Sequence, residues 1–378
     1  MKTVVYADHA ATSPLDEKAL EAMLPFLKGA FGNASQVYSL GRSARKAIEE
    51  ARQKIAECIN ANPSEIYFTS GGTESNNWIL KSASALHMNI VSSAIEHPSI
   101  RQVVTRLSHT KCAEIQVEPS GSIDLSALKT QMQTNSSSGR QSLISVMRAN
   151  NETGILQPIE SIVEIAHVYH ARVHTDAVQA IGHIPVDMHA LDVDYLSASA
   201  HKFNGPKGIG FLAIRQGAPI LSLLNGGAQE ASLRAGTENV ASIVGMAVAL
   251  QNNIQSLETN AKHLRKLEEI CLQIWQDNAI PYTLNGKGNR IPGVISVGFN
   301  QGSGEGLMHQ LDLMGCCIST GSACNQVKTQ ISHVLTAMQV PPNIAQSTIR
   351  ISFGKENTQD DAIKLASSIV KALKLGQK

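Results

Sequence analysis

The sequence predicts an α/β protein with a large domain built on a mostly parallel β-sheet and a smaller α+β domain. Helical and strand patterns alternate from about residue 40, which is typical of crossover units in a parallel sheet. The alternation changes after a long helical pattern at 240–278, and a chain of 378 residues is long enough for about two domains. We place the large domain at 14–255 and the small domain at 1–13 and 256–378.

The elements of the large domain are predicted from hydrophobic periodicity. Residues 41–59 form an amphipathic helical pattern, with Ala44, Ile48 and Ile55 on one face. Short apolar runs bounded by turn residues are typical of buried strands, and they lie at 66–69, 89–92, 113–117, 143–146, 173–176 and 195–199. Helical stretches separate most of them, from about 73 onward and at 98–108, 124–131 and 159–170. A Ser-rich run at 135–140 is expected to be a surface loop.

The small domain shows a different order of elements. A strand at 294–297 and a helix at 306–314 are followed by a loop rich in Gly, Ser and Cys. A second helix at 332–338, a second strand at 349–352 and a final helix complete the domain. Thr358 and Asp361 have the spacing of a capping box, which predicts where the final helix begins.

The composition excludes several classes of protein. Lys and Arg number 32 and Asp and Glu 31, so a net charge of +1 gives no general electrostatic reason to bind nucleic acid or an anionic membrane. A hydrophobic content of 43% is too high for a disordered chain. We find no signal-peptide pattern and no apolar run near the ~20 residues that span a bilayer. We therefore expect a globular protein without membrane association.

Six cysteines, at 58, 112, 271, 316, 317 and 324, include no C-x-x-C pair. Cys316 and Cys317 are adjacent and poorly placed to bridge each other. The pattern favours reduced thiols in a cytoplasmic protein over a disulfide framework, and it gives no metal site.

Reactive side chains follow three predicted strands at their carboxyl ends, where ligands bind in open parallel sheets. Lys202 follows the last of these strands and could form a Schiff base. Asp176 ends the strand before it and could pair with the ring nitrogen of a pyridinium cofactor. The turn after the first strand carries Gly72 and Thr73 ahead of a helix, an arrangement that can hold a phosphate. Taken singly, a surface lysine, a helix cap and an ordinary turn explain these residues at least as well.

Together and in this order, the three features resemble the fold-type-I enzymes that use pyridoxal 5′-phosphate, and more narrowly the cysteine desulfurases of the NifS/IscS type. The resemblance extends over essentially the whole chain. It rests on YADHAAT at 6–12, FGN at 31–33, TSGGTESN at 69–76, EHP at 96–98, NNETG at 150–154, Asp176 with Gln179, SAHK at 199–202, RAGT at 234–237, STGSAC at 319–324 and IRIS at 349–352. It implies a seven-stranded, mostly parallel sheet, pyridoxal phosphate as cofactor and a homodimer.

The resemblance also implies roles for residues around the cofactor ring. Lys202 binds the cofactor aldehyde and later moves the substrate Cα proton. Asp176 pairs with the pyridine nitrogen and Gln179 with the ring hydroxyl. His97 stacks on the ring and assists proton transfer, although a capping or core histidine is the alternative from the sequence alone.

Further roles concern the phosphate and the substrate. The residues expected to hold the phosphate are Gly72, Thr73, Ser199, His201 and, across a dimer interface, Thr237. Arg350 is expected to bind the substrate carboxylate as a planar fork, helped by Asn151, which also contacts the cofactor. A surface ion pair is an equally good explanation of Arg350 when the residue is taken alone.

Cys324 is the expected nucleophile, because it lies in a Gly/Ser-rich loop that gives a thiol access and mobility. The family reaction converts L-cysteine to L-alanine and leaves a persulfide on this cysteine. Polar residues at 325–330 lengthen the loop, which matches the family branch that carries the persulfide to protein acceptors. We expect Cys58, Cys112 and Cys271 to pack in the core, and the roles of the adjacent pair at 316 and 317 stay open.

The chain departs from the family pattern at Tyr38, Ala228, Ala231 and Asn325. These changes concern the acceptor protein and access of the substrate, and none removes a catalytic group. The resemblance leaves iron–sulfur cluster assembly, tRNA thiolation and DNA phosphorothioation open as destinations of the sulfur, reached through acceptor or scaffold proteins and without direct nucleic-acid binding. A selenocysteine lyase or aminotransferase of the same fold is the first alternative, and a catalytically silent sulfur-trafficking scaffold is the second.

Overall fold

The computed structural model describes residues 4–321 and 331–375. Its largest sheet has seven strands in the order β2-β8-β7-β6-β5-β3-β4. Their bounds in that order are Ile66–Thr69, Gly210–Ile214, Tyr195–Ser199, Arg172–Asp176, Ser142–Ser145, Asn89–Ser93 and Cys112–Ile115. The pairings from β7 to β4 are parallel, whereas β8 is antiparallel to both β2 and β7. The α/β class and the seven strands are confirmed, in a sheet that is mixed at one edge.

Strand β8 is the strand of this seven-stranded sheet that the sequence patterns did not predict. It follows the loop after Lys202, and all five of its residues are buried. The run begins with Gly210 and directly continues a loop rich in Gly and Pro, so no turn residue separates the strand from that loop. Its insertion between β2 and β7 produces the two antiparallel pairings.

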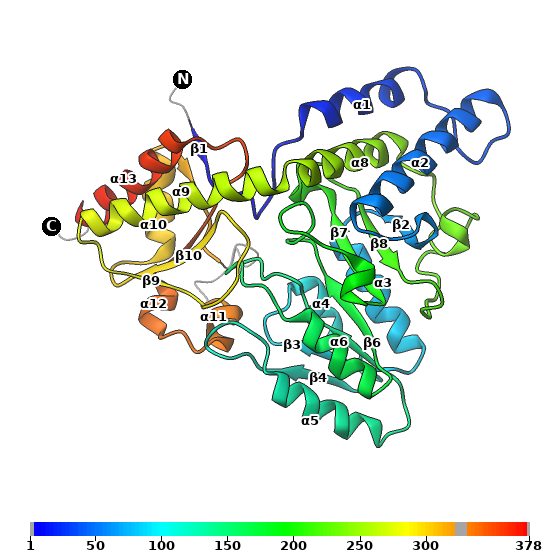
Figure 1. The fold of residues 1–378 in the computed structure, drawn as a ribbon, viewed down its shortest axis with the longest axis horizontal. Helices are drawn as coiled ribbons and strands as arrows, with labels where there is room; N and C mark the ends of the chain where they lie inside the picture. The colour runs from blue at the N-terminus through cyan, green and yellow to red at the C-terminus, as the bar shows by residue number, and fades with distance from the viewer. Residues whose placement is uncertain (1–3, 322–330, 376–378) are drawn as a thin grey trace.

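Helices cover both faces of this sheet (Figure 1). One buried cluster packs residues of α2 (Ser39–Cys58), α5 (Leu125–Ser136), α6 (Ile159–Val168) and α8 (Val240–Gln255) against Val91 and Ile144. A separate cluster packs α3 (Gly72–Ala85) and α4 (Pro98–Val104) against Ile90 and Leu143. Because side chains alternate along a strand, neighbouring residues such as Ile90 and Val91 face opposite helix layers.

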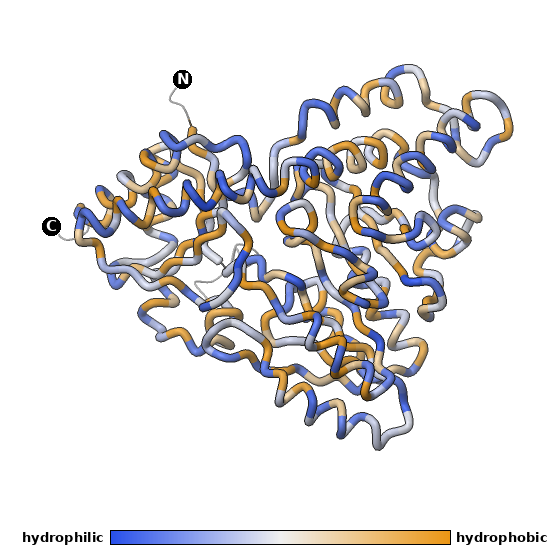
Figure 2. The backbone as a smooth tube through the Cα atoms, in the orientation of Figure 1, coloured by the Kyte–Doolittle hydropathy of each residue, from blue (hydrophilic) through white to orange (hydrophobic). Residues whose placement is uncertain are grey.

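The remaining elements gather in a second lobe, where both ends of the described chain lie (Figure 1). A three-stranded antiparallel sheet has the order β12-β10-β9, with bounds Thr348–Ser352, Val294–Phe299 and Tyr282–Leu284. Strands β1 (Val5–Tyr6) and β11 (Cys316–Cys317) form a short parallel pair. Helices α9 (Leu257–Asp277), α10 (Gly304–Leu313) and α13 (Gln359–Leu375) pack with these strands in one buried cluster. Figure 2 shows hydrophobic and hydrophilic residues alternating along α9 and α13, as amphipathic helices require. The domain boundary at 255/256 stays a prediction.

Several helix boundaries differ from the sequence predictions. The pattern at 240–278 is two helices, α8 and α9, which meet at Ser256. The Ser-rich run at 135–140 is only partly a loop, because α5 continues to Ser136. Helices that the periodicity did not predict are α1 (Glu17–Lys28), α7 (Met188–Leu191) and α12 (Pro342–Gln346). Helix α11 (His333–Ala337) lies within the predicted range.

The capping box at the start of α13 is confirmed. The backbone N–H of Thr358 donates to Asp361 Oδ2 at 2.9 Å, and the N–H of Asp361 donates to Thr358 Oγ1 at 3.2 Å. Each side chain therefore satisfies one of the N–H groups that a helix start leaves without an intrahelical partner.

All three cysteines that were expected in the core contact a core cluster, although their burial differs. Cys271 is buried on α9, whereas Cys58 at the end of α2 and Cys112 on β4 are half-buried and pack against the clusters. All five cysteines within the described residues are free thiols. Across residues 4–321 and 331–375, no helix combines the length and the apolar character needed to cross a bilayer.

Candidate active site

A cavity of about 620 Å³ lies at the carboxyl ends of β6 and β7 and the amino ends of α3 and α4. Ten of the predicted site residues line it: Gly72, Thr73, His97, Asn151, Asp176, Gln179, Ser199, His201, Lys202 and Arg350. Thr237 instead lines a neighbouring cavity of about 130 Å³, with Ser70 and Arg234. Cys324 lies outside the described residues. The sheet thus brings together side chains from most of the chain's length, as parallel strands with a common carboxyl edge do.

Lys202 lies in the short 3₁₀ turn Ala200–Lys202 that directly follows β7. Its Nζ donates to the carbonyl oxygens of Ala10 and Ala11, each at 2.8 Å. The ring of His201 approaches the same segment, with Nδ1 3.2 Å from Thr12 Oγ1. Burial, reinforced by the charge of Lys202, lowers the pKa of His201 to about 4, so this imidazole is neutral at pH 7.

Asp176 is buried at the tip of β6 and accepts hydrogen bonds at both oxygens. Asn76 Nδ2 donates to Oδ2 at 2.7 Å, and the backbone N–H of Val178 donates to Oδ1 at 3.0 Å. Gln179 lies one turn farther and donates from Nε2 to the carbonyl of Ala10 at 3.0 Å. The carboxylate is therefore fixed in position at the wall of the cavity.

The turn between β2 and α3 is shaped for close approach of a ligand. Gly71 has a φ of +149°, and α3 begins at Gly72. A Cβ on Gly72 would lie 2.5 Å from Cγ2 of Val178, so only glycine fits there. The first N–H groups of a helix have no intrahelical partner and attract anions. This geometry suits a phosphate.

His97 is the N-cap residue of α4, where its side chain accepts a hydrogen bond from the backbone N–H of Ser99. Burial lowers the pKa of His97, while Asp176 opposes that shift and Lys202 adds to it. The imidazole is therefore neutral at pH 7, and its pKa responds to the charges of both the Asp176 carboxylate and the Lys202 amine.

Arg350 comes to the cavity from β12 in the second lobe. Its Nη2 donates to Asp8 Oδ1 at 2.6 Å and its Nη1 to the backbone oxygen of Asn151 at 2.8 Å. Only 4% of its side chain is exposed. These contacts orient the guanidinium, so the surface ion pair considered from the sequence is not what the structure shows.

Two buried glutamates adjoin the cavity. Glu152 accepts a hydrogen bond from Ser332 Oγ, and burial raises its pKa to about 7. Glu96 precedes His97, and burial raises its pKa to about 8. Both carboxyl groups stand in motifs that were noted in the sequence, but their burial could not be predicted because it depends on the packing of both lobes.

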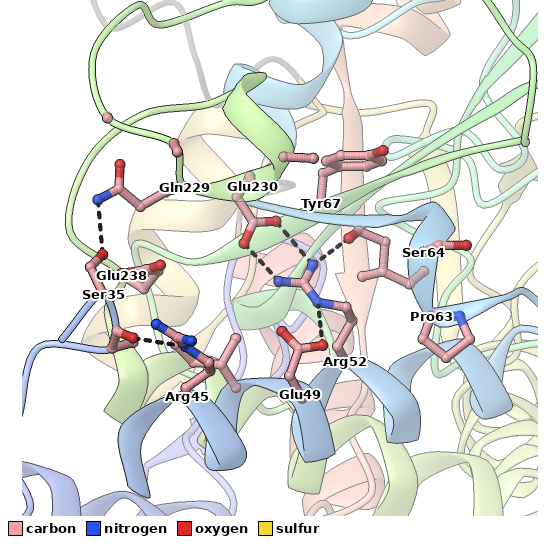
Figure 3. Close-up of a pocket in the computed structure, with 16 residues that line it drawn as sticks. Ser35, Arg45, Glu49, Arg52, Pro63, Ser64, Tyr67, Gln229, Glu230 and Glu238 are labelled. Atoms are coloured by element: carbon pink, nitrogen blue, oxygen red, sulfur yellow. Dashed lines mark hydrogen bonds and ion pairs between the residues drawn. The ribbon is translucent and has the colours of Figure 1, made fainter. Parts of the chain in front are cut away.

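A second, larger cavity of about 910 Å³ lies between α2 and the segment 227–238 (Figure 3). Arg52 points between Glu49 and Glu230 and donates two hydrogen bonds to the Glu230 carboxylate, at 2.8 and 3.0 Å. Its guanidinium also lies over the ring of Phe68, 4.6 Å from the centroid. The departures at Ala228 and Ala231 line this cavity, whereas Lys202 and His97 do not. The ion pairs of Arg52 with Glu49 and Glu230 indicate a structural role for this residue.

The residues of the 620 Å³ cavity fit pyridoxal phosphate. They supply an amine for its aldehyde, a carboxylate for its ring nitrogen, an imidazole for its ring face and a glycine turn at a helix start for its phosphate. Within 4–321 and 331–375, no cluster of three His, Cys, Asp or Glu side chains could hold a metal ion.

A family model described as aminotransferase class-V matches residues 5–365. The chain belongs to this family. A cysteine desulfurase named IscS from Dictyoglomus turgidum is 43% identical over 368 residues, which cover 96% of this chain and 92% of the relative. A solved NifS-like protein has a TM-score of 0.92 at 36% identity, covering 99% of this chain and 100% of its own. A solved structure of SspA in complex with cysteine has a TM-score of 0.82 at 31% identity, covering 94% and 100%.

Class-V aminotransferases, cysteine desulfurases among them, depend on pyridoxal phosphate. The predicted family, fold and cofactor are therefore confirmed. The roles of single residues stay predictions. Asp8, Asn76, Ser99 and Glu152 contact the site but received no role from the sequence, although three of them lie within the motifs quoted above.

Proposed function

We propose that this chain converts L-cysteine to L-alanine and leaves the removed sulfur as a persulfide on Cys324, which is the cysteine desulfurase reaction. The observation that carries the proposal is the convergence of Lys202, Asp176, His97 and Arg350 on one cavity. The near-full-length similarity to relatives named cysteine desulfurase supports the choice of substrate.

Different residues of the cavity bind the cofactor, bind the substrate and transfer protons. Bound pyridoxal phosphate supplies an electron sink that makes the Cα proton of an amino acid acidic. Lys202 holds the cofactor aldehyde and accepts the Cα proton at Nζ, while Asp176 keeps the ring nitrogen protonated. Arg350 binds the substrate carboxylate, with its guanidinium already oriented by Asp8 and Asn151.

The sulfur step balances without an external oxidant. The thiolate of Cys324 attacks the substrate sulfur, so an S–S bond forms while the substrate Cβ–S bond breaks. The carbon fragment keeps the electron pair of that bond and gains a proton, which yields alanine. The enzyme is left with Cys–S–SH, and an acceptor thiol can later remove the outer sulfur.

The decisive experiment follows alanine and sulfide from the purified holoenzyme with L-cysteine and dithiothreitol. We expect equal amounts of both products, and we expect Cys324→Ser to stop sulfide release without loss of the cofactor absorbance. Cys112→Ser, which removes a half-buried thiol on β4, is the matched control and should keep full activity. Normal turnover by Cys324→Ser would refute the nucleophile. Selenide release from selenocysteine without sulfide from cysteine would indicate a selenocysteine lyase.

We also propose a homodimer in which Thr237 contacts the partner's cofactor phosphate. Two observations support it. Thr237 lines a cavity separate from the one that holds the other predicted residues. Large apolar side chains are exposed before α2, with Phe31 and Val37 77% and 79% accessible, and such exposure is typical of an interface.

We infer further that the persulfide passes to an acceptor protein in the cytoplasm, where thiols stay reduced. Iron–sulfur cluster assembly, tRNA thiolation and DNA phosphorothioation all accept sulfur from this reaction. Mass spectrometry of proteins trapped on the Cys324 persulfide would identify the acceptor.

A further inference from the structure

Four side chains in the wall of the 620 Å³ cavity form a continuous chain of hydrogen bonds. Asn76 Nδ2 lies 2.7 Å from Asp176 Oδ2 and 2.8 Å from Ser99 Oγ. Ser99 Oγ in turn lies 2.8 Å from His97 Nδ1. Asn76, Ser99 and Asp176 are buried. The chain therefore connects the expected partner of the pyridine nitrogen to the imidazole that faces the cofactor ring.

The direction of each hydrogen bond is determined from the Asp176 end. An aspartate carboxylate is only an acceptor, and Asp176 already accepts from the backbone of Val178. Asn76 must therefore turn its NH₂ group toward Asp176, because its carbonyl oxygen would be repelled there. The second proton of the same NH₂ group then points to Ser99 Oγ.

This arrangement determines that Ser99 is the donor in its hydrogen bond with His97. Since Ser99 Oγ accepts from Asn76, its single proton is available for His97 Nδ1. The backbone N–H of Ser99 also donates to Nδ1, at 3.1 Å. A ring nitrogen that faces two donors carries a lone pair. The proton of the neutral imidazole must then be on Nε2.

We infer that Ser99 and Asn76 are positioning residues that hold His97 as the Nε2–H tautomer, with Asp176 as the fixed end of the chain. The inference rests on the proposed function only for its catalytic consequence. In this tautomer His97 offers an N–H donor to the cavity and has no lone pair there with which to accept the Cα proton. Lys202 therefore accepts the Cα proton, and His97 donates a hydrogen bond or proton to an oxygen or sulfur acceptor.

The test is ¹⁵N NMR of the holoenzyme labelled at its histidine rings, with the signals of His97 assigned by their loss in His97→Gln. We expect an unprotonated Nδ1 and a protonated Nε2 in the wild type and in Ser99→Thr, which keeps the hydroxyl. In Ser99→Ala the shorter donor is gone, and we expect the second tautomer to appear. Asn76→Ala should also populate the second tautomer, because the Ser99 hydroxyl, no longer bound to Asn76, can turn away from His97. This variant replaces Ser99→Ala in the test if Ser99→Ala does not fold.

Kinetics provide the second readout. We expect Ser99→Ala to lower kcat about tenfold with little change in KM, because one hydrogen bond that orients His97 is lost. Ser82→Ala removes a buried hydroxyl of α3 that bonds to the backbone of Leu221, and it should keep wild-type kinetics. A protonated Nδ1 in the wild type, or an unchanged tautomer in both Ser99→Ala and Asn76→Ala, would overturn the inference. A wild type with this tautomer but no sulfide release would refute the proposed function alone.

Discussion

Arg350 shows how one residue connects the two lobes at the cavity. It stands on β12, yet its two terminal nitrogens donate to Asp8 near the N-terminus and to Asn151 in the loop after β5. Each contact uses a different terminal nitrogen of the guanidinium, so the plane of this group is fixed before a substrate binds. A lysine ammonium lacks the planar fork, so it cannot present two donors in this fixed orientation.

We therefore expect Arg350→Lys to raise the KM for L-cysteine by about 10- to 100-fold, the effect of losing one charged hydrogen bond. Steady-state sulfide release measures it. Arg290→Lys, in an ion pair with Glu268 outside the cavity, is the control and should leave the KM unchanged. An unaltered KM in Arg350→Lys would mean that the carboxylate binds elsewhere.

Glu96 is the residue through which stability should depend on pH. It is fully buried, which raises its pKa to about 8, and Oε1 accepts from Ser93 Oγ and the Met147 N–H. Oε2 has no partner among the residues that the structure describes. The unfolded chain loses this proton near pH 4.3, whereas the folded chain keeps it to about pH 8. This group's stabilising contribution is thus complete below about pH 4 and is lost as the pH rises through 8.

Glu96→Gln keeps the shape of the protonated side chain and removes the titration. We expect its free energy of unfolding, matched to that of the wild type at pH 5, to exceed it by roughly 3–4 kcal/mol at pH 8. Thermal unfolding of the two proteins across this range measures the difference. Glu21→Gln alters an exposed acid on α1 and should show no such divergence. If the difference in free energy of unfolding between Glu96→Gln and the wild type shrinks as the pH rises, the raised pKa of Glu96 is contradicted.

At the scale of elements, the turn between β2 and α3 depends on one close contact. Gly72→Ala would place a Cβ 2.5 Å from Val178 Cγ2. The helix start must then move away from β6, and we expect the affinity for pyridoxal phosphate to fall about tenfold or more. Absorbance titration of the apoenzyme with the cofactor measures this change.

The structure offers both a rescue and a control for that variant. Val178→Ala in the Gly72→Ala background removes the clashing methyl group and should restore most of the affinity. Gly29→Ala changes a glycine with no neighbour within 4 Å of its would-be Cβ and should have no effect. Failure of the rescue would show that the glycine is needed for its backbone freedom and not for space.

Local sequence patterns predicted most elements of the large sheet and failed where no residue marks the boundary of an element. The helix at Ser39–Cys58 and the strand at Ile66–Thr69 agree with their predictions within two residues. The break between α8 and α9 was missed because both helices continue an apolar pattern through Ser256. Strand β8 was missed because it begins at Gly210 directly after a Gly- and Pro-rich loop, which hides its start.

At the scale of the whole molecule, the position of Thr237 outside the 620 Å³ cavity suggests a site completed by a second copy. Combining two impaired variants in one dimer tests this contact. In a heterodimer of Lys202→Ala with Thr237→Ala, a trans contact would give one site with both native residues. We then expect activity near half that of the wild type, assayed on heterodimers purified with two tags.

Each homodimer is the control and should be impaired. If Thr237 acts within its own chain, no heterodimer site contains both native residues. Activity no greater than that of the Thr237→Ala homodimer would therefore overturn the proposed interface contact.

The sequence by itself determined the family, the fold class, the cofactor and which residue types stand at the strand ends, because these depend on local patterns and ordered motifs. It also named ten residues that the structure places around one cavity. Only the tertiary structure decided that Asp8 and Asn151 hold Arg350, that Glu96 and Glu152 are buried, and that Ser99 links His97 to Asn76. Those properties arise from contacts between segments distant in the chain and from exclusion of water, which no local pattern encodes.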